Sequence, residues 1–213
     1  MNALSVSSIA FGMLCGITGV VAGILLILQG NESISGVQIS YIGNEYQSWE
    51  HHTYFALTLI PNYMYSGIAA FLVSASLLYW TALQIHKKQT GSIGFLLLSI
   101  VQLLTGGGFV IDLAIITFLL SLGINKDLHR WKGIFENKMG QFLAAVWIPS
   151  LIVYSILSIA MLSVTIVGMS NQKAMSSMQI LALIMFIPIL LLIFGSIAFE
   201  IQKKQGKIIF ELP

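Results

Sequence analysis

Long apolar runs separated by short polar segments dominate the chain. Windows such as 8–29 and 140–169 contain no charged residue. A transmembrane helix needs roughly 20 apolar residues to cross a hydrocarbon core about 30 Å thick, so runs of this length predict membrane-spanning helices. The pattern therefore predicts an all-α, polytopic integral membrane protein. Four full spans are expected over 8–29, 54–83, 140–169 and 175–201.

The fifth apolar run, 92–122, does not fit a single span. Its 31 residues would form a straight helix about 46 Å long, well beyond the hydrocarbon thickness. Three consecutive glycines, 106–108, lie near its centre, and each helical glycine costs about 1 kcal/mol relative to alanine. We therefore expect a glycine-broken helical hairpin with arms 92–105 and 109–122. It is either re-entrant or a pair of short tilted helices.

The basic residues predict the topology, because Lys and Arg are enriched in cytoplasmic loops. A hairpin at the fifth run places nine of the ten Lys and Arg on one side, whereas a single crossing divides them seven and three. The charges therefore favour the hairpin and place both termini on the cytoplasmic side. They also make 30–53 an outer loop and 123–139 a basic inner loop. Glu200, beside Lys203 and Lys204, is expected to form a solvated ion pair at the inner boundary.

The composition supports a membrane protein and excludes several classes. Of the residues, 57% are hydrophobic and 8% are charged, against about 25% charged in an ordinary soluble domain. The net charge of +2 is too small to indicate nucleic-acid binding, and the basic residues flank apolar spans. The single cysteine, Cys15, excludes an internal disulfide. No repeat or linker divides the chain, so 1–213 is expected to form one transmembrane domain in the lipid bilayer.

Small residues predict a packing face on the first helix. Gly12, Gly16, Gly19 and Gly23 lie within a narrow stripe at 3.6 residues per turn. Such GxxxG faces allow two helix backbones to approach closely. The partner is either another helix of this chain or a homo- or hetero-oligomer formed through the first helix.

The inner loop has an amphipathic pattern. Basic residues, among them Lys126, Arg130 and Lys132, alternate with apolar residues three or four positions apart, including Trp131. Basic residues beside anionic headgroups and a Trp at the interface are typical of a helix lying on the inner leaflet. A cytoplasmic extension of the next span is the alternative. The apolar row consists of Ile124, Leu128, Trp131, Phe135, Met139 and Phe142.

Asp112 is the one ionisable residue well inside an apolar segment, and it closely follows Gly106, Gly107 and Gly108. A carboxylate there costs about 2.5 to 3.5 kcal/mol on insertion scales, so an intramembrane acid is a functional hypothesis by default. Broken helices with such acids form ion and proton sites in transporters. A protonated Asp112 bonded to backbone carbonyls freed by the glycine break is the structural alternative.

Glu50, His51 and His52 at the end of the outer loop are candidate metal ligands. Zinc takes three or four N, O or S ligands, but adjacent histidines on a helix point about 100° apart. They would need a bend or a further ligand from elsewhere to converge. A pH-sensitive outer surface and an ordinary headgroup-facing polar cluster are the alternatives.

Function is constrained mainly by what the sequence lacks. It contains no GxxxxGK[ST], GxGxxG, HExxH or GxSxG motif, and no histidine lies within the interior of a span, so no cofactor is expected. We expect a non-catalytic interaction or accessory component of the cell membrane. The alternative is a small permease or ion- or proton-coupled transporter using Asp112. An outer-face metal-dependent enzyme comes third.

Overall fold

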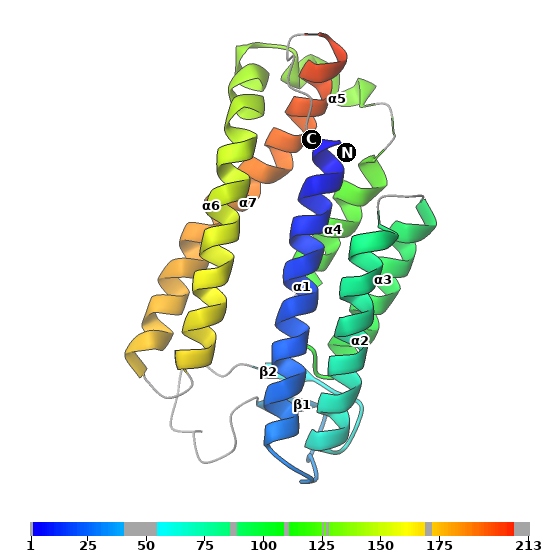
Figure 1. The fold of residues 1–213 in the computed structure, drawn as a ribbon, viewed down its shortest axis with the longest axis vertical. Coiled ribbons are helices and arrows are strands. Elements are labelled where there is room, and N and C mark those ends of the chain that lie inside the picture. The colour runs from blue at the N-terminus through cyan, green and yellow to red at the C-terminus, as the bar shows by residue number, and fades with distance from the viewer. Residues whose placement is uncertain are drawn as a thin grey trace. The chain divides into compact units, whose positions relative to one another are not determined.

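Seven helices and one two-stranded antiparallel sheet are formed by the residues that the structure, a computed structural model, describes (Figure 1). The described residues are 2–40, 55–85, 89–108, 111–124, 126, 128–168 and 172–206. The helices are α1 (Ala3–Leu28), α2 (Tyr63–Leu83), α3 (Gln89–Leu104), α4 (Ile111–Gly123), α5 (His129–Phe135), α6 (Lys138–Gly168) and α7 (Gln172–Lys204), and the strands are β1 (Gln38–Ser40) and β2 (Phe55–Leu57).

Four helical segments are long and apolar enough to cross a membrane, so the predicted multi-pass α-helical architecture is confirmed at this level. Each overlaps one of the four apolar runs that predicted full spans. The shorter apolar helices, α3 and α4, lie on either side of the three glycines. The candidate spans are Ala3–Leu28, Tyr63–Leu83, Lys138–Ser163 and Ile180–Lys204.

The second helix begins later than the expected 54–83. Residues Phe55–Leu57 pair with β1, and α2 starts at Tyr63. Asn62 caps this start, because its side chain accepts a hydrogen bond from the backbone N–H of Tyr65 at 3.1 Å. Hydropathy alone cannot separate the apolar strand from the apolar helix, so the prediction of a span from residue 54 was wrong.

The described contacts divide the chain into two compact units, Met1–Ala10 with Leu119–Pro213, and Phe11–Phe118. Helices α1 and α4 each contribute residues to both units, so neither α1 nor α4 belongs to one unit alone. The predicted single domain stays a prediction. We call the first the α6/α7 unit and the second the α2/α3 unit.

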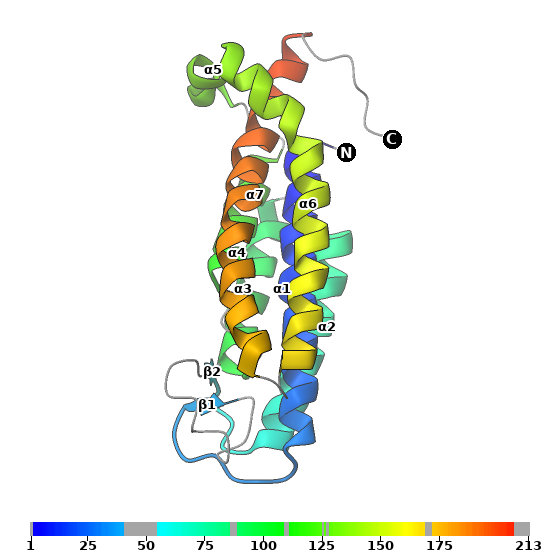
Figure 2. The same ribbon diagram turned by 90° about the vertical axis from the view of Figure 1, so that its left-hand side faces the viewer.

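The core of the α6/α7 unit is formed by two long helices that pack side by side (Figure 2). The buried ring of Trp147 in α6 lies 5.0 Å from that of Phe199 in α7, and its Nε1 donates to Ser7 Oγ of α1 at 3.0 Å. At Gly195 an added Cβ would lie 3.0 Å from the Leu143 carbonyl, so α7 needs a small residue there. Close backbone approach through small residues is typical of membrane helix pairs.

The apolar row predicted for the inner loop does not lie on one helix. α5 ends at Phe135 and α6 begins at Lys138, while Ile124 and Leu128 precede α5. The side chain of Asn137 between the two helices accepts from the backbone N–H of Gly140 at 3.1 Å, as an N-cap does. This cap marks the start of α6 as a helix separate from α5. The described residues of the inner loop therefore form neither a single amphipathic helix nor a simple extension of α6.

Candidate functional site

The three glycines form the turn that ends α3. Gly107 N–H donates to the Gln102 carbonyl at 2.8 Å and Gly106 N–H to the Leu103 carbonyl at 3.5 Å. These two bonds are the pattern of a Schellman cap, which needs a left-handed residue after the helix. Gly106, at φ 92°, supplies it, and Gly108 has φ 96°. The glycines therefore cap α3 and turn the chain before α4.

Gln102 is the main buried polar residue beside this turn, and it was not predicted as a site residue from the sequence. Its side chain is 1% exposed, and its Nε2 donates to the Cys15 carbonyl of α1 at 2.9 Å and to the Gly107 carbonyl at 3.4 Å. A Cβ at Gly19 would collide with this amide and with Ser74 Oγ of α2. The amide therefore occupies the space that the absent side chain of Gly19 leaves. A polar residue four positions before Gly106 in an apolar run was the available signal.

Two polar atoms of this cluster have no hydrogen-bond partner among the described residues. They are Gln102 Oε1 and Ser74 Oγ, and both side chains are almost fully buried. A buried polar atom without a partner is costly in an apolar environment. The cluster can therefore accept a hydrogen bond from a bound molecule.

The segment that precedes α2 covers the end of α3. Leu59 N–H donates to the Leu104 carbonyl at 2.9 Å, and Ser66 Oγ lies 2.8 Å from both the Thr105 carbonyl and Thr58 Oγ1. The last carbonyls of a helix lack intrahelical partners, and here residues from the chain before and within α2 supply them. The α3 terminus is thus satisfied by protein groups.

Asp112 lies in the first turn of α4, and its side chain is exposed. It lies within electrostatic reach of Cys15 in α1. No hydrogen bond or ion pair of its carboxylate is found among the described residues, which include the carbonyls of the glycine turn. The structure therefore gives no support to the expected bond between a protonated Asp112 and those carbonyls.

The glycine stripe of α1 lies against α2 and α3. A Cβ at Gly12 would meet Thr81 and Phe95, and one at Gly16 would meet Leu78. At Gly23 a Cβ would lie 2.7 Å from a backbone nitrogen of α2. The stripe is thus covered within the chain, and an oligomer formed through α1 would have to use another face.

Glu200 does not form the expected solvated pair. Its side chain is 9% exposed, and Oε1 accepts a hydrogen bond from the backbone N–H of Ala3 at 2.5 Å. Asn2 Oδ1 accepts from Ser5 N–H at 2.7 Å in the same turn. The first N–H groups of a helix are unsatisfied and lie at its positive end, so a carboxylate there is stabilising. The end of α7 therefore caps the start of α1.

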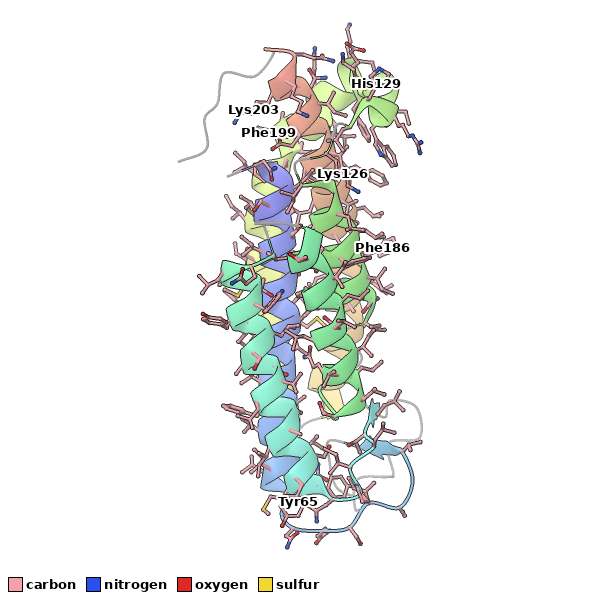
Figure 3. All side chains as sticks on the ribbon, turned by 90° about the vertical axis from the view of Figure 1, so that its right-hand side faces the viewer. Tyr65, Lys126, His129, Phe186, Phe199 and Lys203 are labelled. Atoms are coloured by element: carbon pink, nitrogen blue, oxygen red, sulfur yellow. The ribbon has the colours of Figure 1, made fainter. Side chains whose placement is uncertain are left out.

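A basic surface surrounds α5 and the end of α7 (Figure 3). Arg130, Trp131 and Lys132 are exposed on α5, with Trp131 at 41%, and Lys126 is exposed just before it. We call these four residues the α5 surface. Lys138, Lys203 and Lys204 are exposed on the neighbouring helices.

Contacts with α7 hold the α5 surface in place. Gln202 Nε2 donates to the Phe135 carbonyl at 2.6 Å, and Gln205 Nε2 donates to Glu136 Oε1 at 2.7 Å. The buried ring of Phe135 lies 6.1 Å from that of Trp131 and 6.4 Å from that of Phe194. The short helix is therefore fixed at its C-terminal end and exposed elsewhere.

The predicted metal ligands Glu50, His51 and His52 lie outside the described residues. Within the part of the chain that is described, no group of three or more His, Cys, Asp or Glu could hold a metal ion. The proposal of an outer-face metal site therefore gains no support from the described residues.

Comparison with known proteins does not indicate a function for this chain. No protein-family model matches the chain, and no curated protein or solved structure is significantly similar to it.

Proposed function

We propose that this chain is a non-catalytic, multi-pass membrane protein that acts by binding other membrane components, with the α5 surface on anionic headgroups of the cytoplasmic leaflet. The exposed α5 surface is the main support for this proposal. Arg130, Trp131 and Lys132 are exposed on a short helix that α7 anchors, and Lys126 is exposed just before it. Cations beside an interfacial aromatic ring suit an anionic lipid surface.

A contact between the start of α1 and the end of α7 supports the cytoplasmic orientation. The start of α1 and the end of α7 are joined by the Ala3–Glu200 hydrogen bond, so they lie at the same end of the α6/α7 unit. The α5 surface lies at this end too, because Gln202 contacts Phe135. Cytoplasmic segments next to membrane spans are enriched in Lys and Arg, so this end is assigned to the cytoplasm.

For α3 and α4, two short spans are favoured over a shallow re-entrant loop. At 16 and 13 residues the helices extend about 24 and 20 Å. The segment before α2, on the proposed outer side, reaches the end of α3 through Leu59 and Thr58. Protein groups thus complete the outer part of the crossing, where non-helical backbone would otherwise meet lipid.

Lipid binding by the full-length protein tests the main proposal. Native mass spectrometry would compare retention of phosphatidylserine and phosphatidylcholine by the purified protein. One basic residue near an anionic surface contributes about 1 kcal/mol, or roughly fivefold in affinity. The double variant Arg130→Gln/Lys132→Gln should therefore lose at least about tenfold in phosphatidylserine affinity.

The matched control exchanges the two cations and keeps their charge. Arg130→Lys/Lys132→Arg should retain phosphatidylserine binding, because headgroup attraction here depends mainly on charge. Equal retention of both lipids by the unaltered protein, or no change in the neutral double variant, would contradict the proposal.

A second candidate function is an ion- or proton-coupled permease in which Asp112 and Gly106–108 form the coupling site. The unpartnered buried atoms Gln102 Oε1 and Ser74 Oγ favour it, because they place polar groups next to the glycine turn. Proton flux into vesicles that contain the purified protein tests this function. Asp112→Asn should abolish a coupled flux, and a flux equal to that of empty vesicles would exclude it.

A further inference from the structure

The outward face of α4 combines one acid with apolar side chains. Asp112, Ile115 and Leu119 follow one another at three and four residues and are all exposed. The other side of the helix is buried at Ala114 and Thr117. Helical residues at this spacing share one face, so the carboxylate stands at one end of an exposed apolar strip.

The length of α4 places this acid near the middle of the bilayer. A Cβ at Gly123, the last residue of α4, would lie 3.5 Å from Leu4 Cδ1 in the first turn of α1. The end of α4 is therefore level with the start of a candidate span. From Gly123 back to Asp112 the helix rises about 16 Å, which is half the thickness of a typical hydrocarbon core.

An exposed carboxylate at that depth is expected to pair with another polar or charged group. Acids within membrane spans almost always face protein or water and pair with another group. Between residues 3 and 28, 63 and 83, 90 and 123, 139 and 172, and 174 and 202 the sequence contains no Lys or Arg. This chain cannot supply a cation at mid-depth, and a second copy cannot supply one either.

We propose that the outward face of α4 docks a transmembrane helix of another membrane protein, which presents a Lys or Arg at mid-depth to Asp112. This inference rests on the proposed binding function and names the class of partner. Ile115 and Leu119 would pack against apolar residues of the docked helix. The ion pair sets the register, because only a cation at the same depth can reach the carboxylate.

The test uses the full-length protein in lipid vesicles with a synthetic polyleucine transmembrane peptide that carries one central Lys. Energy transfer from a dye on Gly133→Cys, at an open position of α5, to a dye on the peptide measures binding. Interhelical polar contacts in membranes change affinity by about threefold to tenfold, so the Lys peptide should bind tighter than an all-Leu peptide by this factor.

The variants identify the carboxylate as the recognised group. Asp112→Asn should remove the preference for Lys, and Asp112→Glu should keep it. Glu32→Gln, which alters an exposed acid outside the candidate spans, should bind the Lys peptide as the unaltered protein does. A peptide with the Lys moved by seven residues, about 10 Å, should lose the advantage.

Three results would overturn the proposal. The first is equal binding of the Lys and all-Leu peptides. The second is a change in self-association of the chain on Asp112→Asn, which would make a second copy the occupant. The third is a proton flux that depends on Asp112 while peptide binding does not. The lipid measurement on Arg130 and Lys132 does not involve Asp112, so failure of helix docking and failure of lipid binding are separate outcomes.

Discussion

Glu200 and Ala3, separated by nearly the whole chain, are joined by a hydrogen bond from the Ala3 backbone N–H to the Glu200 carboxylate. Removing a charged acceptor from a buried bond costs about 1.5 to 3 kcal/mol. We therefore expect Glu200→Ala to lower the free energy of unfolding by this amount, measured in detergent micelles. Glu200→Gln keeps an acceptor and should lose less.

The control for that measurement is Lys204→Ala, an exposed substitution one turn further along α7. It should change stability by no more than about 0.5 kcal/mol. If Glu200→Ala were as mild as this control, the carboxylate would not be the cap that the hydrogen bond indicates.

Gly19 leaves the space in which the Gln102 amide lies. A Cβ there would lie within 2.2 Å of Ser74 Oγ and collide with the amide. Gly19→Ala should therefore displace Gln102 and cost about 1 to 3 kcal/mol, the range for overpacking. Thermal unfolding measures the loss. Gly133→Ala, where nothing lies within 4 Å of the added carbon, should be neutral or stabilising.

Gly106 occupies the left-handed region that ends α3. The left-handed conformation costs alanine about 1 to 2 kcal/mol of conformational free energy, whereas asparagine tolerates it better. Gly106→Ala should therefore be less stable than Gly106→Asn in the same unfolding assay. Gly123→Ala, where the added carbon makes an ordinary 3.5 Å contact, is the matched control. A reversed order of the two Gly106 variants would contradict the assignment of the turn.

Cysteine labelling in whole cells tests the topology. In a chain with Cys15→Ala, a cysteine at Ser35 should react with a membrane-impermeant reagent from outside, because Ser35 is exposed in the proposed outer loop. A cysteine at Gly133 should react only after the membrane is permeabilised. Labelling of Gly133→Cys in intact cells would place α5 outside and contradict both the orientation and the lipid proposal.

The sequence predicted helix boundaries well where the backbone chemistry is local. The arm expected over 92–105 corresponds to α3, Gln89–Leu104, because three glycines interrupt a helix whatever surrounds them. The start of α2 at Tyr63 was missed, because the preceding apolar residues belong to a strand and a capping segment. The residues that pair with this strand and with the capping segment lie elsewhere in the chain, and hydropathy does not indicate which residues pair.

The contacts of the candidate sites were harder to predict for the same reason. The partner of Gln102 is a carbonyl 87 residues away, and the partner of Glu200 is 197 residues away. A glycine face in α1 could be recognised from its spacing, but its occupants in α2 and α3 could not. The position of Asp112 four residues beyond the glycines was visible in the sequence, whereas its exposed orientation required the fold.

The cap on α3 also has a consequence for synthesis. Thr58 and Leu59 leave the ribosome before α3 does, so the groups that complete its last turn are already present when the helix forms. N-terminal parts of a chain generally fold first during synthesis. Neither α3 nor α4 is long enough to be a stable span alone, and the earlier segment offers the nascent pair a ready docking point. The order in which α3 folds would then follow from chain order, because the residues that complete its last turn are made before it.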